Sequence, residues 1–336
     1  MNILDLIKKI ISQVRNLNKR FVFPEGEDER ILKAISFVIK KRIIKPIVLG
    51  DENEIKRKAK KYKINVADIE IINPKKNKNL MKYAHLYSKK SKIPLKTAEL
   101  ITQKPLFYAT LMIAAGDADC LVAGAVYSSG EVIAVCKKII GLQKGISVPS
   151  SFFLMNIPNY SGGEKGNLIY SDASVNPNPS AKELADIALI SGQTAKRLFG
   201  WDPRVALLSF STKGSAEHPD VCKVVQATEL AKMKAKGMKI DGEFQADTAL
   251  VPEVAKKKIK GKAGLVAGKA NVLIFPDLDA GNIAYKLTQR LAGAKAYGPF
   301  LQGFASPVSD LSRGATVEDI IGVIAVLSYW SKRWKK

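Results

Sequence analysis

Apolar and polar positions along this chain follow two alternating periods. Short apolar runs such as 20–26 (RFVFPEG) end at proline, glycine or an acidic residue, which is typical of buried strands. Most of these runs are followed by a segment with apolar residues three or four positions apart, such as 28–41 (DERILKAISFVIKK), which predicts a helix. Further strands are expected at 45–51, 69–73, 117–125, 146–157, 166–172, 204–211 and 270–278. Because strands alternate with helices, the chain is expected to be an α/β protein with largely parallel sheets.

The pattern restarts near residue 147, which places the best domain boundary at 145–150. A chain of 336 residues is long enough for two domains, each with its own core. In open α/β sheets, ligands gather at the carboxyl ends of strands and at the helix N-termini that face them. The loops that this rule selects are 24–28, 124–130, 172–179, 211–215, 276–282 and 306–314.

The charge balance is strongly basic, with 54 lysines and arginines against 31 acidic residues and a formal net charge of +23. Such an excess suits either a nucleic acid or a small anionic substrate. The lysines lie mainly on predicted helices such as 55–63 (IKRKAKKYK), and no aromatic residues interleave with them in a stacking pattern. We therefore expect a small anionic substrate and no nucleic acid.

The few cysteines and histidines exclude several classes of site and enzyme. Cys120, Cys136 and Cys222 have no paired spacing, so neither a zinc site nor a disulfide framework is expected. His85 and His218 are the only histidines, and neither belongs to a recognisable nucleophile motif, which argues against a Ser-His or Cys-His hydrolase. No run of about 18 apolar residues is present, so we expect a soluble, cytoplasmic protein without a membrane span.

Two polar loops after strands are candidate ligand sites. Segment 210–220 (FSTKGSAEHPD) joins a strand to a helix, and its backbone N–H groups and hydroxyls could hold phosphate oxygens. Its spacing does not match a P-loop, so an ordinary capped connection is an equal alternative. In segment 172–184, Asn176 and Asn178 each precede a proline and are therefore biased towards extended backbone. This segment either lines a cleft or only ends a strand.

Segment 275–282 (FPDLDAGN) offers Asp277, Asp279 and Asn282. Oxygen ligands of this kind can bind Mg²⁺, but these residues more often cap the helix that follows a strand. Capping is the preferred interpretation, and we expect no metal.

The segment 306–319 (SPVSDLSRGATVED) precedes a nearly all-apolar helix and admits two interpretations. Thr316 and Asp319 fit a variant of the capping box with Asp in place of Glu. Alternatively, Arg313 binds an anion with both arms of its guanidinium, Ser312 donates a hydroxyl, and Asp319 acts as a base in the same cleft. The local pattern does not decide between them.

Several long motifs in order resemble the phosphate acetyltransferases of the phosphate acetyl/butyryl transferase family. They include FPEGEDERILKA, SDASVNPNP, RVALLSFSTKGSA, DGEFQADTAL, ANVLIFPDLDAGNIAYKLTQRLAGAKAYGPFLQGF and PVSDLSRG, and the match runs from about Arg20 to Ala325. The resemblance implies two three-layer α/β/α domains with a cleft between them, in an isocitrate/isopropylmalate dehydrogenase-like fold. It also implies a first domain of 1–148 plus 300–336, a second domain of 149–299, and a homodimer.

The activity that the resemblance implies is reversible acetyl transfer between acetyl-CoA and phosphate, which gives acetyl phosphate and CoA. Asp319 would be the general base, Arg313 would hold the phosphoryl group, and Ser312 would hydrogen-bond the thiol or the developing oxyanion. CoA enters as a substrate, and neither a cofactor nor a metal is implied. The substrate-binding candidates are Ser128, Ser129, Lys90, Lys137, Asn176, Ser211, Thr212 and Gly214.

The chain departs from the family pattern at several places. Ala134 stands where the family commonly has an arginine, and Lys89 and Lys90 lie where it tends to have another. Lysine keeps the charge but loses the bidentate fork, and alanine loses both. Lys137 or Lys138, one helical turn from Ala134, could compensate.

These departures leave two alternatives beside the acetyltransferase. One is a butyryltransferase-like phosphate acyltransferase, and the other is a weakly active or non-catalytic relative that binds CoA or acetyl phosphate. The departures at Cys120 and Tyr127, where the family has glycine and His or Asn, belong to the same region. A dehydrogenase on the same fold has no nicotinamide fingerprint to support it.

Overall fold

The computed structural model describes residues 10–235, 237–261 and 264–333. These residues form two compact units. One unit is continuous and spans 144–303, and the other is discontinuous and combines 10–143 with 304–333.

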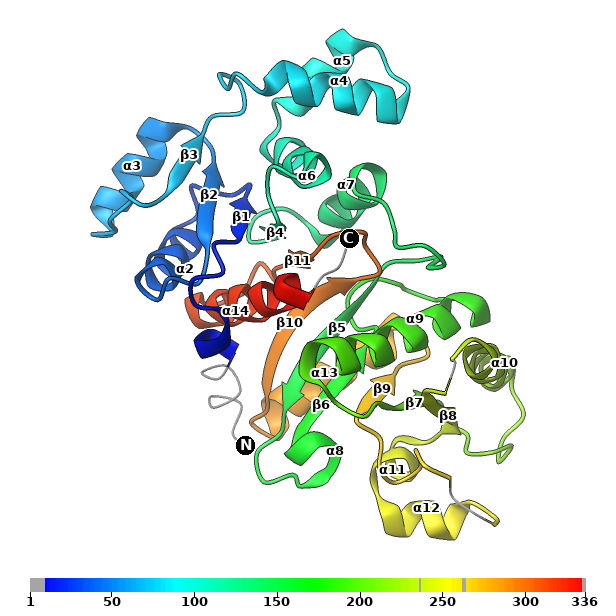
Figure 1. Ribbon diagram of the computed structural model, residues 1–336. Coiled ribbons are helices and arrows are strands. Elements are labelled where there is room, and N and C mark those ends of the chain that lie inside the picture. Colours follow the sequence, from blue (N-terminus) through cyan, green and yellow to red (C-terminus); the bar gives the residue numbers. More distant parts are fainter. Residues whose placement is uncertain (1–9, 236, 262–263, 334–336) are drawn as a thin grey trace. The chain divides into compact units, whose positions relative to one another are not determined.

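The discontinuous unit has an all-parallel sheet in the order β3-β2-β1-β4-β11. Its strands are β1 (Arg20–Phe23), β2 (Lys45–Leu49), β3 (Glu70–Ile72), β4 (Cys120–Ala123) and β11 (Val308–Asp310). Its helices are α2 (Glu29–Lys40), α3 (Glu52–Lys61), α4 (Leu80–Ser91), α5 (Leu95–Thr102), α6 (Pro105–Ala115), α7 (Ser129–Ile139) and α14 (Val317–Arg333). Helices α2 and α14 pack together, while α6 packs against α7 (Figure 1). The pairing of β11 with β4 joins the C-terminal segment to strands that precede it by almost two hundred residues.

The sequence explains why these elements form. Parallel strands that are covered on both faces read as unbroken apolar runs, and β4 (CLVA) is buried at every position. Helix α2 begins where Asp28 accepts hydrogen bonds from the N–H groups of Arg30 and Ile31, and its apolar face is buried.

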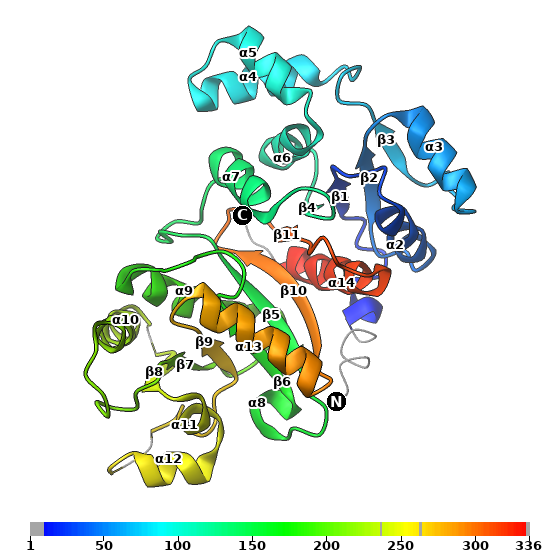
Figure 2. The same cartoon turned by 180° about the vertical axis from the view of Figure 1, so that it is seen from behind.

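The continuous unit has a mixed sheet in the order β10-β5-β6-β9-β7-β8. Its strands are β5 (Ser150–Asn156), β6 (Asn167–Ser171), β7 (Arg204–Leu208), β8 (Lys239–Phe244), β9 (Val272–Ile274) and β10 (Lys295–Gln302). Its helices are α8 (Gly162–Lys165), α9 (Ala181–Thr194), the π-helical turn η1 (Ala195–Phe199), α10 (Pro219–Lys234), α11 (Ala246–Leu250), α12 (Pro252–Lys258) and α13 (Leu278–Leu291). Helix α9 covers one face of the sheet in Figure 1, and α13 covers the other face in Figure 2.

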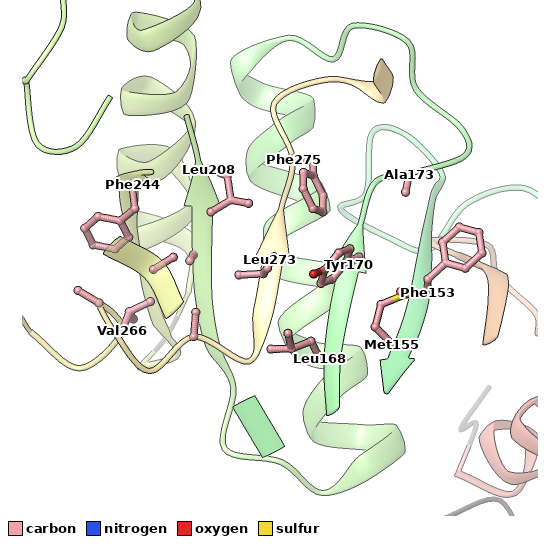
Figure 3. Packing of buried hydrophobic residues seen from close by; sticks show 14 of the residues in the cluster. Phe153, Met155, Leu168, Tyr170, Ala173, Leu208, Phe244, Val266, Leu273 and Phe275 are labelled. Atoms are coloured by element: carbon pink, nitrogen blue, oxygen red, sulfur yellow. The ribbon is translucent and has the colours of Figure 1, made fainter. Parts of the chain in front are cut away.

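The core of the continuous unit lies against the strands β5, β6, β7 and β9. Figure 3 shows Phe153, Tyr170, Leu208, Leu273 and Phe275 side by side along these neighbouring strands and their ends, and they belong to one buried cluster. Within the sheet, β5 runs antiparallel to both β6 and β10, whereas the remaining pairs are parallel.

The predicted α/β class is confirmed. Segment 180–200 (SAKELADIALISGQTAKRLFG) has the apolar spacing of a long helix, and α9 and η1 lie there. Ser180 caps α9 through a capping box with Glu183, and Gly200 ends the π-helical turn with a φ of 71°. Among the described residues, no helix combines the length and the apolar character needed to cross a bilayer.

Candidate active site

The connection from β11 to α14 carries Ser312 and Arg313, and Asp319, the third residue expected to be catalytic, lies in the first turn of α14. Ser312, Arg313 and Gly314 are exposed, between the buried residues Leu311 and Ala315. The N–H of Leu311 donates to the carbonyl of Ala123 at 2.6 Å, which ties the start of the loop to the end of β4. The loop therefore exposes a short polar turn, and its first residue is held by a hydrogen bond to β4.

Asp319 forms the capping box that the sequence offered. Its Oδ2 atom accepts hydrogen bonds from the N–H and the hydroxyl of Thr316 at 2.9 and 2.8 Å, and the Thr316 hydroxyl accepts from the N–H of Asp319 at 3.2 Å. The cap uses Oδ2 alone, so Oδ1 is not engaged by it. The capping and catalytic interpretations of Asp319 are thus compatible in space.

The side chain of Arg313 is exposed, and no described residue forms an ion pair or hydrogen bond with its guanidinium. Its backbone carbonyl, in contrast, accepts a hydrogen bond from Arg30 Nη1 at 2.6 Å. The cationic group is therefore available to an anion while the backbone that carries it is held.

The loop that follows β4 is organised by an internal carboxylate. Glu25 is only 7% exposed and lies just after β1. Its two oxygens accept hydrogen bonds from four consecutive N–H groups, of Gly124, Ala125, Val126 and Tyr127, at 3.3, 2.9, 2.7 and 2.8 Å. These donors form an anion-binding concavity that the protein fills itself.

Asp310, the last residue of β11, is fully buried. Neither of its carboxyl oxygens has a hydrogen-bond partner among the described residues. Burial raises the pKa of Asp310 to about 7, the nearby Ser129 hydroxyl, which completes no hydrogen bond to it, opposes the rise, and the negative charge of Glu25 adds to it. The Asp310 carboxyl group therefore keeps its proton up to about pH 7, well above the pH at which an ordinary aspartate ionises.

The candidate residues Ser128 and Ser129 begin α7. The Ser128 hydroxyl accepts the N–H of Glu131 at 3.3 Å, and the Glu131 carboxylate accepts the N–H of Ser128 at 2.9 Å, which completes a capping box. Lys137 lies exposed in the last turn of this helix. Its neighbour Lys138 lies over the ring of Tyr87 in α4, 5.3 Å from the centroid.

Helix α4 also carries the candidate Lys90, which is exposed in the last turn together with Lys89. Ala134 is exposed on α7, three residues before Lys137 and four before Lys138. On a helix this spacing puts both lysines on the face of Ala134. Because the ammonium of Lys138 is placed on an aromatic ring, Lys137 is the freer of the two cations.

A pocket of about 510 Å³ opens at the carboxyl ends of β1 and β2 in the same unit. Four carboxylates line its wall, those of Glu25, Glu27, Asp28 and Glu29, together with the cation Lys58. Arg30 pairs with Asp28 and Lys33 with Glu29. This charge balance disfavours a phosphate group at this wall.

In the continuous unit, Asn176 belongs to a loop built around Asp172. The side-chain amide of Asn176 donates to Asp172 Oδ2 at 2.6 Å and to the carbonyl of Pro149 at 2.8 Å. Asp172 also accepts the N–H groups of Ser174, Val175 and Asn176. The amide of Asn176 is thus turned to the protein and holds the loop against the chain that enters β5.

The loop that carries Ser211, Thr212 and Gly214 is closed around another buried carboxylate. Glu243 Oε1 accepts the Ser211 hydroxyl at 3.0 Å and the Gly214 N–H at 2.7 Å. The Thr212 hydroxyl accepts the N–H of Gln245 at 2.9 Å. These donors and this hydroxyl have internal partners, so the loop resembles a phosphate-binding turn that is occupied by the protein's own acid.

The residues of the 275–282 segment act as capping and bridging groups. Asp277 accepts the N–H of Ala280 at 2.8 Å and caps α13, and the Asn282 amide donates to the carbonyl of Ala173 at 3.1 Å. Over the described ranges, no three His, Cys, Asp or Glu side chains are grouped so that they could bind a metal ion.

Sequence reasoning missed the residues that build these loops, namely Glu25, Arg30, Asp172, Glu243 and Asp310. Asp172 directly follows β6, and Glu25 lies two residues after β1. Glu243 and Asp310 are the penultimate residue of β8 and the last residue of β11, and Arg30 is the second residue of α2. The strand-end rule selected the regions of Glu25, Asp172 and Asp310. It offers no means of telling a residue that holds a loop from one that faces a ligand.

Comparison with known proteins identifies the class. A model of the family described as "Phosphate acetyl/butaryl transferase" matches residues 5–328. The chain is 46% identical over 325 residues to a phosphate acetyltransferase from Thermoanaerobacterium thermosaccharolyticum, covering 96% of this chain and 98% of the relative. The chain therefore belongs to this family of transferases, as the sequence motifs predicted.

Solved structures of similar fold support the same assignment. A phosphotransacetylase from Streptococcus pyogenes superposes with a TM-score of 0.92 at 38% identity, covering 99% of this chain and all of the other. A putative 4-hydroxythreonine-4-phosphate dehydrogenase from Salmonella typhimurium superposes with a TM-score of 0.54 at 14% identity, covering 94% of this chain and 99% of the other. The second likeness concerns the fold alone, and it confirms the predicted dehydrogenase-like fold class.

Proposed function

We propose that this protein is a phosphate acetyltransferase that transfers an acetyl group reversibly between acetyl-CoA and phosphate. The observation that carries the proposal is the guanidinium of Arg313, which has no partner among the described residues and lies on a polar turn six residues before Asp319. The chain that carries it belongs to this family. The names of the full-length relatives support acetyl as the transferred group.

In the direction of acetyl-CoA synthesis, the CoA thiolate is the nucleophile. Asp319 accepts the thiol proton, sulfur bonds to the carbonyl carbon of acetyl phosphate, and the carbon–oxygen bond to phosphate breaks with its electron pair on the leaving phosphate. Arg313 binds the phosphoryl oxygens and offsets their charge in the transition state. Ser312 donates a hydrogen bond to the thiol or to the developing oxyanion. No covalent enzyme intermediate is required.

The remaining candidates contribute binding in this proposal. Lys137 and Lys90 offer exposed cations for the phosphates of CoA, and Ser128 and Ser129 lie at the N-terminus of α7, where the helix dipole favours an anion. Asn176, Ser211, Thr212 and Gly214 act by shaping loops, because the hydrogen bonds described above turn them inward. The formal charge of +23 favours the approach of anionic substrates at low ionic strength.

The test is thioester formation from acetyl phosphate and CoA by the wild-type protein beside Arg313→Gln. We expect a loss of about a hundredfold or more in kcat for the variant. The control is Arg57→Gln, because Arg57 is an exposed residue of α3 that pairs with Glu54 three residues away. Equal rates for wild type and Arg313→Gln would reject the assigned role of Arg313, and a wild type without turnover would reject the function.

We also propose a homodimer and a cytoplasmic location. Helix α13 carries Ile283, Leu287 and Leu291 at four-residue spacing with exposures of 56, 52 and 82%, an apolar stripe that suits a second copy of this chain. The three cysteines are free thiols, which agrees with a reducing compartment. Sedimentation of the wild type beside Leu287→Glu tests the dimer, and an unchanged mass in the variant would contradict this surface.

A further inference from the structure

Arg30, the second residue of α2, has all of its hydrogen-bonding capacity directed at the protein. A guanidinium has five N–H donors. Nε donates to Asp28 Oδ1 at 3.1 Å, and Nη2 donates to Asp28 Oδ2 at 2.8 Å and to the Ala125 carbonyl at 2.9 Å. Nη1 donates to the carbonyls of Arg313 at 2.6 Å and of Ala315 at 3.2 Å. Five donors thus meet five acceptors.

These acceptors belong to three separate segments of the discontinuous unit. Asp28 lies after β1, Ala125 lies after β4, and Arg313 with Ala315 lies after β11. Arg30 therefore joins the carboxyl ends of three strands at one point. Because no N–H is left over, Arg30 has no donor to offer a substrate anion.

The turn that Arg30 holds has few other restraints. Within it, the N–H of Gly314 donates to the Ser312 hydroxyl at 3.2 Å, and the N–H of Ala315 donates to the Ser312 carbonyl at 2.9 Å. Both bonds are local, and neither fixes the turn relative to the sheet. The two carbonyls bound by Arg30 flank Gly314, so Arg30 anchors this glycine-containing turn on both sides.

We infer that Arg30 is a positioning residue for the acyl transfer proposed above, and that it acts by fixing the backbone of Arg313 and thereby the direction of the Arg313 side chain. Holding the carbonyls of Arg313 and Ala315 fixes the path of the backbone through the turn and with it the direction of the Arg313 Cα–Cβ bond, which restricts where its guanidinium can go. Asp28 holds Arg30 in turn through a bidentate pair. The inference rests on the proposed function.

Lysine cannot take this role. Its ammonium is a single point with three donors, whereas the acceptors around Arg30 are spread over three segments that only a planar fork can reach together. A lysine at position 30 keeps the positive charge beside Asp28 but loses the hydrogen bonds to the carbonyls of Arg313 and Ala315.

The first measurement compares kcat and KM for wild type, Arg30→Lys and Arg30→Ala, with Arg57→Ala as the control arginine. A displacement of the reacting groups by about 1 Å costs about a hundredfold in rate, so we expect kcat to fall by about that factor in both Arg30 variants. The KM for CoA should stay within about twofold, since Arg30 itself has no donor for it. Unchanged kcat in Arg30→Lys would overturn the inference.

The second measurement is a double-mutant cycle with Arg313→Gln. If Arg30 acts through Arg313, replacing Arg30 in the Arg313→Gln background should change kcat by less than about threefold. Multiplicative losses would show that Arg30 acts independently and would overturn the inference. Should Arg30→Ala fail to fold, the cycle is run with Arg30→Lys, which retains the charge.

Chemical rescue separates positioning from general stability. The Arg30 side chain is 29% exposed, so added ethylguanidinium can reach the space left by Arg30→Ala. We expect it to restore part of kcat in Arg30→Ala and none in Arg30→Ala/Arg313→Gln, and equal effects in both would contradict the inference. A wild type without acetyltransferase turnover would reject the proposed function and this role together. An active wild type with a multiplicative cycle would reject the role of Arg30 alone.

Discussion

The carboxyl group of Asp310 lies directly against the α-carbon of Gly124. A Cβ atom added at Gly124 would stand 2.3 Å from Asp310 Oδ1 and 2.5 Å from the Leu311 carbonyl oxygen. Gly124 also has a backbone φ of 104°, a value that residues other than glycine rarely adopt. The end of β4 and the start of the Ser312–Gly314 turn are therefore in contact through a position that only glycine can fill.

The Gly124→Ala variant should be strongly destabilised. The alanine Cβ would collide with Asp310, and alanine disfavours the positive φ at this position. Together these effects should lower the free energy of unfolding by about 3 kcal/mol or more. Urea unfolding measures this loss. Gly130→Ala is the matched control, because a Cβ there meets nothing within 4 Å and Gly130 lies in the first turn of α7. Similar stabilities for the two variants would contradict the assigned contact.

Asp310 should make stability depend on pH. Its pKa is about 7 in the folded protein against 3.8 for an ordinary aspartate, so the folded state binds the extra proton between these values. The contribution of Asp310 to stability is thus fully present below about pH 4, falls as the pH rises, and is lost above about pH 7. Asp310→Asn cannot titrate and should lose this dependence.

Denaturant unfolding of Asp310→Asn and wild type at pH 5, 6.5 and 8 checks the expectation. Relative to wild type, the variant should gain stability from pH 5 to about pH 7 and change little above that pH. Asp68→Asn, which alters an exposed carboxylate, serves as the control. Parallel pH profiles for Asp310→Asn and wild type would show that Asp310 is ionised in the folded protein.

Thr316 and Asp319 allow the cap of α14 to be separated from catalysis. Thr316→Ala removes the hydroxyl of the capping box and should cost about 1 kcal/mol of stability with little change in kcat. Asp319→Asn should lower kcat by about a hundredfold or more, because an amide cannot accept the thiol proton. Unfolding experiments and steady-state kinetics on both variants measure the two effects. If the two variants lose activity equally, Asp319 acts only as a cap.

Lys137→Ala should raise the KM for CoA. Lys137 is exposed on the face of α7 that also carries Ala134, where the family commonly has an arginine. A single exposed contact between a cation and a phosphate predicts a change of about three- to tenfold, weakening as salt is added. Lys60→Ala on α3 is the control. An unchanged KM for both substrates would show that Lys137 does not compensate for Ala134.

Much of the fold was predictable because local patterns determine local structure. The alternation of apolar runs with helical spacing predicted the α/β class. Ser180 and Gly200 mark the start of α9 and the end of η1, which continues it. The direction of β5 was not predictable, since an apolar run is the same whether its neighbours are parallel or antiparallel. The family likeness directed attention to Ser312, Arg313 and Asp319, which local pattern alone left undecided.

By itself, the sequence determined which segments are strands and helices, where their caps lie and which loops follow strand ends, because these depend on neighbours within a few residues. Only the tertiary structure determined that Glu25, Asp172 and Glu243 accept the hydrogen bonds that hold those loops. It also determined that Arg30 donates hydrogen bonds to the turn that carries Arg313. Arg30 and Arg313 are 283 positions apart. Their hydrogen bond depends on the packing of three parallel strands, and no short-range pattern encodes which distant carbonyl a guanidinium will meet.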